Sequence, residues 1–149
     1  MITYQEERLH DFLEELKPIL NNHYDELSVT KSFNLNPDYD RYLKLEDLGS
    51  FFIMTCRLDG QLIGYIAYFL YPHIHYKDCM TAMEDLYYVE KEHRQGRVGL
   101  KLFSESEKIL KDKGVNRIIL SCKTHQDHTR LFEHLGYHFY EKHFTKMLG

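Results

Sequence analysis

The chain has 149 residues, a length that suits one domain with one hydrophobic core. Hydrophobic residues make up 43% of it and charged residues 28%, the balance of an ordinary globular protein. The formal net charge of −4 argues against a nucleic acid partner, because binding by bulk attraction requires a basic face. The longest apolar run, residues 63–71, is far shorter than the ~20 residues of a membrane span, and residues 1–7 lack the features of a signal peptide. We therefore expect one soluble domain over residues 1–149 that stays in a cytoplasm, with no membrane partner.

Two helices are predicted in the first third of the chain. Thr3 and Glu6 form a capping-box signature, and apolar residues follow at helical spacing over residues 9–20. Pro18 is expected to end or bend this helix, because proline removes a backbone donor from a helix interior. The second helix is predicted to begin with Asn36 as its N-cap and a proline in its first turn.

Strands dominate the middle of the chain. Residues 51–57 and 62–71 are rich in aromatic and β-prone side chains, and Asp59-Gly60 between them is typical of a two-residue hairpin turn. A third strand is predicted at about residues 80–89 and a helix at 97–113. The remaining predictions are a strand at 115–122, a short helix at 127–135 and a final segment with strand character at 137–147. Because hairpins precede the β-α-β crossovers, the fold class is α/β with a mixed, twisted central sheet and helices on both faces.

The cysteines and histidines do not predict a metal site. Three widely spaced cysteines in apolar runs are typical of reduced thiols rather than of a disulfide framework. His73 and His75 with Cys79, and His125 with His128, contain metal-ligating residue types. Neither group has the four-ligand spacing of a structural zinc site, so we expect no metal.

A charged loop between the third strand and the following helix is the segment most suited to chemistry. Its sequence is H-R-Q-G-R-V-G, residues 93–99. Backbone N–H groups at a helix start have no intrahelical acceptor, and the helix dipole adds positive potential, so such a start can bind a pyrophosphate. Gly96 and Gly99 allow close approach of the backbone, while Arg94 and Arg97 can donate charge-assisted hydrogen bonds to phosphate oxygens. On local chemistry alone, a helix with a solvated basic first turn is the alternative.

Residues 86–102 resemble motif A of the GNAT acetyltransferases, in which a strand leads into Q/R-x-x-G-x-G/A and an amphipathic helix. Residues 131–137, L-F-E-H-L-G-Y, are similar to the closing L-Y-E-K-L-G-F element of the same family. Residues 23–26, 35–39, 60–65 and 75–76 are similar to a GNAT subgroup often carried by bacteriophages. The resemblance covers nearly the whole chain and implies the GNAT fold. For a phage-encoded chain it implies the host cytoplasm as the location.

The resemblance implies that the chain uses acetyl-coenzyme A to acetylate a primary amine of a small molecule or a protein. The transfer would be direct, without a covalent enzyme intermediate. The strand would bind the pantetheine arm through the backbone of Leu86, Tyr87, Tyr88 and Val89. The loop and helix start would bind the pyrophosphate through Arg94, Gln95, Gly96, Arg97, Val98, Gly99 and Leu100. The acceptor pocket would be lined by His23, Glu26, Tyr39, His75 and Tyr76.

Two positions depart from the family pattern. Arg97 stands where motif A usually has its middle glycine, and Gly96 comes one place earlier. Phe132 stands where many members carry a tyrosine that protonates the leaving thiolate, and phenylalanine has no donor. These departures leave open a second hypothesis, a catalytically weak or inactive GNAT-fold effector or virion-associated interaction protein that still binds coenzyme A.

The acceptor amine must lose a proton before it attacks, and two carboxylates are candidates for the base. Glu84 and Asp85 are adjacent, so on a regular strand they point to opposite faces and one of them can face the acyl site. A bulge in the strand would change which one it is, and both remain open. Tyr137 and Tyr140 are candidates for the missing proton donor, with a packed aromatic as the alternative for each. The final segment can pair within the chain or with a second copy, which leaves a homodimer open.

Overall fold

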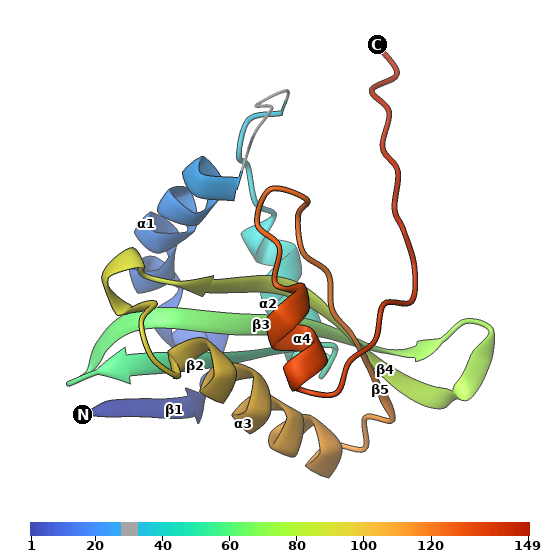
Figure 1. Cartoon of the computed structure of the whole chain (residues 1–149), viewed down its shortest axis with the longest axis horizontal. Helices are drawn as coiled ribbons and strands as arrows, with labels where there is room; N and C mark the ends of the chain where they lie inside the picture. Colours follow the sequence, from blue (N-terminus) through green and yellow to red (C-terminus); the bar gives the residue numbers. More distant parts are fainter. Residues whose placement is uncertain (28–32) are drawn as a thin grey trace.

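The computed structural model describes residues 1–27 and 33–149, and within them the protein has a five-stranded sheet in the order β1-β2-β3-β4-β5 (Figure 1). The strands are β1 Ile2–Glu6, β2 Phe51–Leu58, β3 Gln61–His73, β4 Tyr76–Val89 and β5 Arg117–Ile119. The helices are α1 Leu9–Leu27, α2 Tyr39–Asp47, α3 Val98–Asp112 and α4 Thr129–His134, with a short 3₁₀ helix at Lys91–His93. The first four strands are antiparallel, and β5 runs parallel to β4. The predicted mixed sheet is confirmed.

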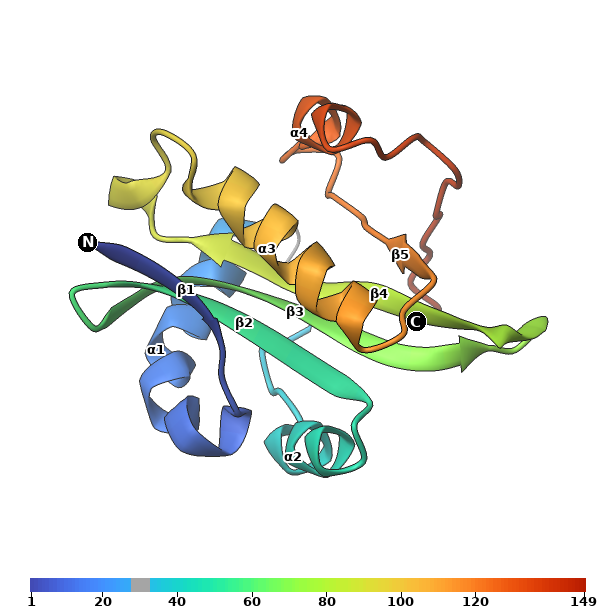
Figure 2. The same ribbon diagram turned by 90° about the horizontal axis from the view of Figure 1, so that it is seen from below.

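Helices cover both faces of the sheet, as expected (Figure 2). The face toward α3 and α4 is filled by one group of buried side chains, which includes Met54, Ile66, Tyr68, Leu102 and Phe103. The face toward α1 and α2 is filled by a second group, which includes Leu16, Phe51, Ile53, Tyr65 and Ala67. Neighbouring residues of β2 and β3 alternate between the two groups, because successive side chains of a strand point to opposite faces. The two faces are called here the α3 face and the α1/α2 face.

The first residues form a strand, so the predicted capping box at Thr3 and Glu6 is wrong. Thr3 pairs with Arg57 of β2, and Glu6 pairs with Met54. Ile2 and Tyr4 pack on the core of the α3 face while Thr3 is exposed, and this alternation is the period of a half-buried strand. The helix begins only at Leu9, whose N–H donates to a Glu46 carboxylate oxygen at 2.5 Å.

Pro18 does not end α1, one of the two outcomes predicted for it. The helix continues to Leu27, and the residue with non-helical backbone angles inside it is Phe12, at φ −137°. Leu16, Leu20 and His23 lie on both sides of the proline and are all buried against the sheet. This burial offsets the hydrogen bond that the proline removes.

The second helix begins two residues later than predicted. Asp38, not Asn36, is its N-cap, and the Asp38 carboxylate accepts a hydrogen bond from the Arg41 N–H at 3.0 Å. The hairpin turn between β2 and β3 is confirmed, since Asp59 and Gly60 have positive φ angles of 49° and 88°. Two successive residues of this kind match the right-handed twist of the flanking strands.

The C-terminal part contains less strand than predicted. Strand β5 covers only Arg117–Ile119 of the predicted 115–122, and no strand forms in residues 137–147. Residues 138–149, called here the C-terminal arm, run as an extended chain away from the sheet (Figure 1). Strand β5 therefore has a neighbour only on its β4 side, and this one-sided support accounts for its short length.

Candidate active site

The sheet opens between its two parallel strands. Residues 81–83 of β4 pair with Arg117–Ile119 of β5, and beyond Ile119 the chain leaves the sheet toward α4. Residues 84–89 of β4 pair with β3 on one side and have no strand partner on the other in the described chain. Their backbone groups on that side can hydrogen-bond to an extended ligand. The segment predicted to bind pantetheine, residues 86–89, lies along this open edge, and we refer to the opening as the split.

The predicted anion-binding loop ends beside the split. Arg97 precedes α3 without a side-chain cap, and the Lys101 N–H to Arg97 carbonyl bond, at 2.9 Å, is at the helix start. The N–H groups of residues 98–100 consequently have no intrahelical acceptor. Gly96 has a φ of +88°, a left-handed conformation that side chains disfavour, and nothing lies where its Cβ would be. The loop therefore offers free donors on an exposed turn.

Gly99 has a packing role as well. A Cβ at this position would overlap the hydroxyl of Tyr87, which lies against the first turn of α3. The Tyr87 ring contacts Phe103, with ring centroids 4.6 Å apart, and meets the His128 ring edge-on at 5.5 Å. Burial raises the pKa of Tyr87 to about 12, so its hydroxyl keeps its proton at neutral pH.

Arg94 is tied to the body of the protein. Its Nη2 donates to Glu26 of α1 at 2.5 Å, and its Nε donates to the Val89 carbonyl at 2.8 Å. Its guanidinium also lies 5.3 Å from the centre of the Tyr88 ring. The hydrogen bond from Arg94 lowers the pKa of Glu26. Arg94 thus joins the loop to α1, and its role toward phosphate stays a prediction.

The two candidate carboxylates lie at the origin of the split, on opposite faces of β4. The pairing of β3 with β4 shifts between Ala67 and Tyr68, which pair with Leu86 and Glu84. Asp85 is therefore the extra residue of a β-bulge. Its Oδ2 accepts a hydrogen bond from the Tyr42 hydroxyl of α2 at 2.6 Å, which places it on the α1/α2 face. Glu84 shares the α3 face with its pairing partner.

The two carboxyl groups also differ in the causes that set their pKa values. Burial raises the pKa of Glu84 to about 8, with a smaller contribution of the same sign from the charge of Asp85. Burial also raises the pKa of Asp85, and the hydrogen bond from Tyr42 opposes this. At neutral pH the Glu84 carboxyl group is mostly protonated, whereas the charged form of Asp85 has a donor beside it.

Three of the five predicted acceptor residues lie on the α1/α2 side. His23 is buried, its Nδ1 lies 2.8 Å from the Tyr65 hydroxyl, and its ring stacks on Tyr88. Burial lowers the pKa of His23 to about 4, so its imidazole is neutral at pH 7. Glu26 binds Arg94, as described above. Tyr39, at the start of α2, lies under the Lys17 ammonium group at 5.1 Å.

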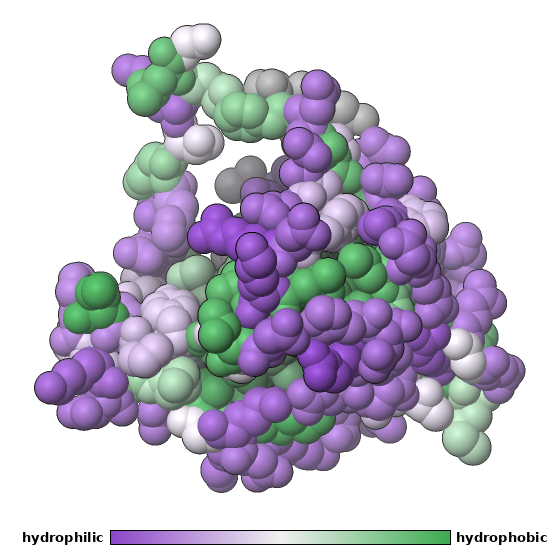
Figure 3. Space-filling model, turned by 180° about the vertical axis from the view of Figure 1, so that it is seen from behind, coloured by the Kyte–Doolittle hydropathy of each residue, from purple (hydrophilic) through white to green (hydrophobic). Residues whose placement is uncertain are grey.

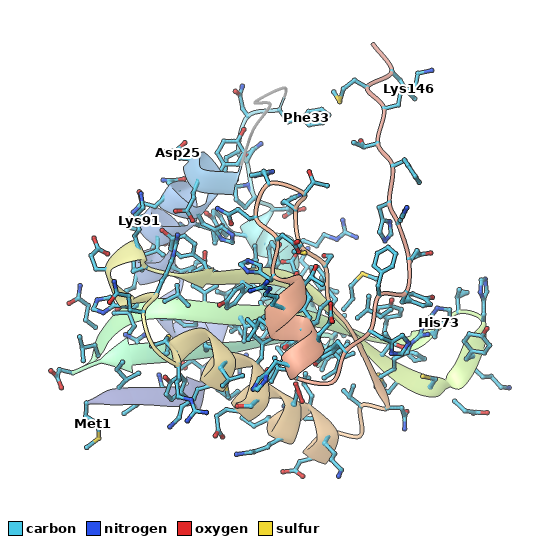
Figure 4. The ribbon with its side chains drawn as sticks, in the orientation of Figure 1. Met1, Asp25, Phe33, His73, Lys91 and Lys146 are labelled. Atoms are coloured by element: carbon cyan, nitrogen blue, oxygen red, sulfur yellow. The ribbon has the colours of Figure 1, made fainter. Side chains whose placement is uncertain are left out.

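The other two predicted acceptor residues lie apart from this group. His75 lies in the turn between β3 and β4, and Tyr76 is the first residue of β4; both are exposed to solvent. Figure 4 shows the neighbouring His73 at the opposite end of the molecule from Lys91, which begins the 3₁₀ helix before the predicted anion-binding loop. Tyr140 lies on the C-terminal arm, with its ring 5.9 Å from the Arg117 guanidinium at the start of β5, and among the described residues it makes no hydrogen bond with either carboxylate.

Phe132 is packed among aromatic rings and brings no donor to the split. Its ring contacts Phe103 edge-on at 5.6 Å and lies 6.2 Å from that of Tyr137, whose hydroxyl donates to Glu107 of α3 at 3.1 Å. The nearby polar side chain is His128, with ring centroids 6.1 Å apart.

Sequence reasoning missed Tyr42 and His128. Tyr42 is one of several apolar or aromatic residues in its helix, and only the packing of α2 on the sheet reveals its hydroxyl as the partner of Asp85. His128 carries no local signal, because its neighbours at the split come from β4 and α4.

Within residues 1–27 and 33–149, no group of three or more His, Cys, Asp or Glu side chains is placed to hold a metal ion. Of the helices formed by these same residues, none combines the length and apolar character needed to cross a membrane.

The mixed sheet, the split between its parallel strands and the uncapped helix beside it together define the GNAT fold. The chain belongs to the acetyltransferase (GNAT) family, whose family model matches residues 9–137. It is therefore an N-acetyltransferase of the class that uses acetyl-coenzyme A. Among curated protein sequences, none is significantly similar to it.

Solved structures of acetyltransferases share the fold at low sequence identity. A ribosomal-protein-alanine N-acetyltransferase from Brucella melitensis is 17% identical, with a TM-score of 0.75 and 100% of both chains covered. An aminoglycoside acetyltransferase from an uncultured soil metagenomic sample, in complex with sisomicin, is 15% identical, with a TM-score of 0.76 over 99% of this chain and 97% of that one. A predicted acetyltransferase with acetyl-CoA from Clostridium acetobutylicum is 14% identical, with a TM-score of 0.72 over 99% and 96%.

Proposed function

We propose that this protein transfers the acetyl group of acetyl-coenzyme A directly to a primary amine at the split between β4 and β5. The observation that carries the proposal is the open edge of β4, residues 84–89, which begins at two partly buried carboxylates and leads to the uncapped start of α3. No other part of the described chain combines unpaired strand backbone, free helix-start donors and partly buried acids with raised pKa values.

The residues around the split fit acetyl-coenzyme A. The N–H groups of residues 98–100 and the exposed side chains of Gln95 and Arg97 can bind its pyrophosphate. The free backbone of residues 86–89 can hydrogen-bond to its pantetheine arm. When bound, the co-substrate supplies an activated thioester carbonyl, and the chain itself supplies orientation and proton transfer.

We assign the role of base to Asp85. An amine acceptor is mostly protonated at neutral pH, so its nitrogen must lose a proton before it can attack the carbonyl. Asp85 faces the side of α1 and α2, where His23, Glu26 and Tyr39 lie, and Tyr42 positions it with a 2.6 Å hydrogen bond. This group of side chains supports an acceptor that enters from the α1/α2 face.

We assign to Glu84 the proton that the leaving thiolate requires. Phe132 has no donor, and Glu84 lies on the α3 face with a carboxyl group that is protonated at neutral pH because burial raises its pKa to about 8. Two neighbouring carboxyl groups whose environments separate their pKa values are suited to act as an acid and a base. The nitrogen loses a second proton as the amide forms, and this proton and the one held by Asp85 leave to solvent. Glu84 takes one proton up again, so the cycle closes with one proton released for each acetyl group transferred.

The acceptor is proposed as a primary amine of a small molecule or a protein. Structures of the same fold carry both kinds of name, the aminoglycoside enzyme and the ribosomal-protein enzyme described above. The similarity to a subgroup often carried by bacteriophages supports a further proposal, that the chain is phage-encoded and acts in the cytoplasm of a host cell.

Titration calorimetry and a thiol-release assay test this function. We expect acetyl-CoA to bind and an amine panel to release coenzyme A, and we expect Asp85→Asn to lower kcat by about 10²- to 10⁴-fold. In the same assay Glu84→Gln should be slow with acetyl-CoA but should recover with acetyl thioesters of more acidic thiols, which leave without protonation. Glu14→Gln, whose side chain is 84% exposed, is the matched control and should keep full activity.

The assay also separates the alternative function. Phe132, without a donor, favours a GNAT-fold protein that binds coenzyme A and has lost catalysis. Binding of acetyl-CoA with no thiol release for any amine would support that alternative and overturn the enzymatic proposal. Absence of binding at millimolar acetyl-CoA would contradict both.

A further inference from the structure

Arg117, the first residue of β5, has hydrogen-bond donors without acceptors. Its Nε and Nη2 are buried and have no hydrogen-bond partner. A buried donor without an acceptor is costly, and more so in a charged group. These two nitrogens lie on one edge of the planar guanidinium, the edge that binds both oxygens of a carboxylate or a phosphate in parallel. We call these two donors the Arg117 fork.

The surroundings of the fork are aromatic and supply no negative charge. The guanidinium lies 5.9 Å from the centre of the Tyr140 ring. Burial, and after it the positive charge of Arg117, lower the pKa of His73 at the end of β3, whose ring lies 6.5 Å from that of Tyr71 and 5.1 Å from that of Tyr76. None of the ion pairs of the described chain includes Arg117. An anion from outside the chain would therefore meet a positive charge that no carboxylate offsets.

The Arg117 fork lies on the same face of the sheet as Asp85, the proposed base. Ile118 packs on the core of the α3 face, so its neighbour Arg117 points to the α1/α2 face. Arg117 pairs with Thr81 of β4, and the stretch from Thr81 to Asp85, which contains the bulge, spans roughly 10–13 Å. Met83, between them on the same face, is 37% exposed, so a ligand can lie along this part of β4.

We propose that the Arg117 fork binds an anionic group of the acceptor while the acceptor amine lies at Asp85. The inference rests on the proposed acetyl transfer and narrows its acceptor to amines that carry a carboxylate or a phosphate. The separation of the two residues along β4 sets the distance from the amine to the anionic group at roughly 10–13 Å, about the length of a three-residue peptide. An acceptor without such a group leaves the two donors unpaired and is therefore used less well.

A ligand can reach the fork by displacing one ring of the C-terminal arm. That ring belongs to Tyr140, which is 61% exposed, and the arm makes no backbone hydrogen bond to the sheet in the described structure. Figure 3 shows the arm standing apart from the rest of the surface. Moving the ring therefore breaks no backbone hydrogen bond between the arm and the sheet, and the anion takes its place beside the guanidinium.

Matched acceptors test the inference in the thiol-release assay. Diglycine, triglycine and tetraglycine are each compared with their C-terminal amides, which lack the negative charge, and a peptide amide that ends in phosphoserine separates phosphate from carboxylate. For the wild type we expect a charged form to have a kcat/KM about 10- to 100-fold above that of its neutral counterpart, mainly through KM.

Variants of Arg117 should remove this preference. Arg117→Gln should lower kcat/KM for the charged acceptors and leave that of the amides unchanged. Arg117→Lys, which keeps the charge without the fork, should also lose most of the preference. Lys108→Gln, whose side chain is 69% exposed on α3, is the matched control for the loss of one positive charge and should keep the preference of the wild type.

NMR of the Arg117 Nε–H group measures anion binding without any reaction. In the absence of acetyl-CoA, inorganic phosphate and triglycine should shift this signal saturably, and triglycine amide should not. If they do so but no amine releases coenzyme A, the proposed function fails while the anion site stands. Transfer to neutral amines with no gain from a negative charge, or a preference that survives Arg117→Gln, overturns the inference and leaves the function in place. A signal that no anion shifts, or that shifts in Glu141→Gln before any ligand is added, overturns it as well, because in the second case the arm itself fills the fork.

Discussion

The Glu84 carboxyl group, at the origin of the split, makes the stability of the protein depend on pH. Burial raises its pKa from 4.5 to about 8. Between these values the unfolded chain has released the proton while the folded chain still holds it. Folding stability from this group is therefore fully present below pH 4.5 and is lost as the pH rises to 8. Since one pKa unit corresponds to ~1.4 kcal/mol, the loss is at most about 5 kcal/mol.

Replacing Glu84 with glutamine removes the titration and keeps the shape of the side chain. At pH 5 we expect Glu84→Gln and the wild type to have free energies of unfolding within about 1 kcal/mol. At pH 9 the variant should be more stable by several kcal/mol, up to the limit of about 5. Urea unfolding followed by circular dichroism measures both, which suits a chain without tryptophan.

The exposed control variant Glu14→Gln should differ from the wild type by no more than about 0.5 kcal/mol at either pH. The reasoning is refuted if Glu84→Gln changes the free energy of unfolding equally at pH 5 and pH 9. A variant that is less stable than the wild type at pH 9 would refute it as well, because the buried charge would then be stabilising.

Three other predictions follow from contacts around the split. Tyr42→Phe removes a hydrogen bond that favours charged Asp85, so the pKa of Asp85 should rise and the acidic limb of the kcat–pH profile should move to higher pH; an unmoved limb would remove Tyr42 from the site. Gly99→Ala should destabilise the fold by roughly 1–3 kcal/mol in thermal unfolding and weaken acetyl-CoA binding in calorimetry, because its methyl group overlaps the Tyr87 hydroxyl, and adding Tyr87→Phe should recover part of the loss. His23, with a pKa of about 4, should show constant imidazole NMR shifts from pH 8 down to about pH 5, and a midpoint near 6.5 would contradict its burial.

The order of the central elements could be predicted because their signals are local. The Asp59-Gly60 turn fixes the hairpin, and long runs with clear periodicity give β2, β3 and α3. The errors fall where tertiary contacts outweigh local preference. Thr3 and Glu6 satisfy a helix cap, but pairing with β2 makes them a strand, and burial on both sides of Pro18 keeps its helix intact.

The geometry of the candidate site could be predicted on the side of the anion-binding loop but not on the side of α1 and α2. The loop before α3 is one contiguous stretch, so the free N–H groups of residues 98–100 follow from sequence position. The opposite face is assembled from separate elements, and Tyr42 meets Asp85 only because α2 packs on the α1/α2 face of the sheet. His75 and Tyr76, which a similarity in sequence grouped with the acceptor residues, lie instead where β3 and β4 join.

The choice between Glu84 and Asp85 depends on one extra residue in β4. Alternation along a strand requires the two carboxylates to point to opposite faces, but it does not say which face each takes. If the pairing that joins Ala67 to Leu86 continued without a shift, Asp85 would pair with Tyr68 and share its α3 face. The bulge instead pairs Tyr68 with Glu84, so the two carboxylates exchange faces and Asp85 turns toward α2. Because a bulge is defined by the register with a neighbouring strand, β4 alone does not show which carboxylate faces α2, and its register with β3 does.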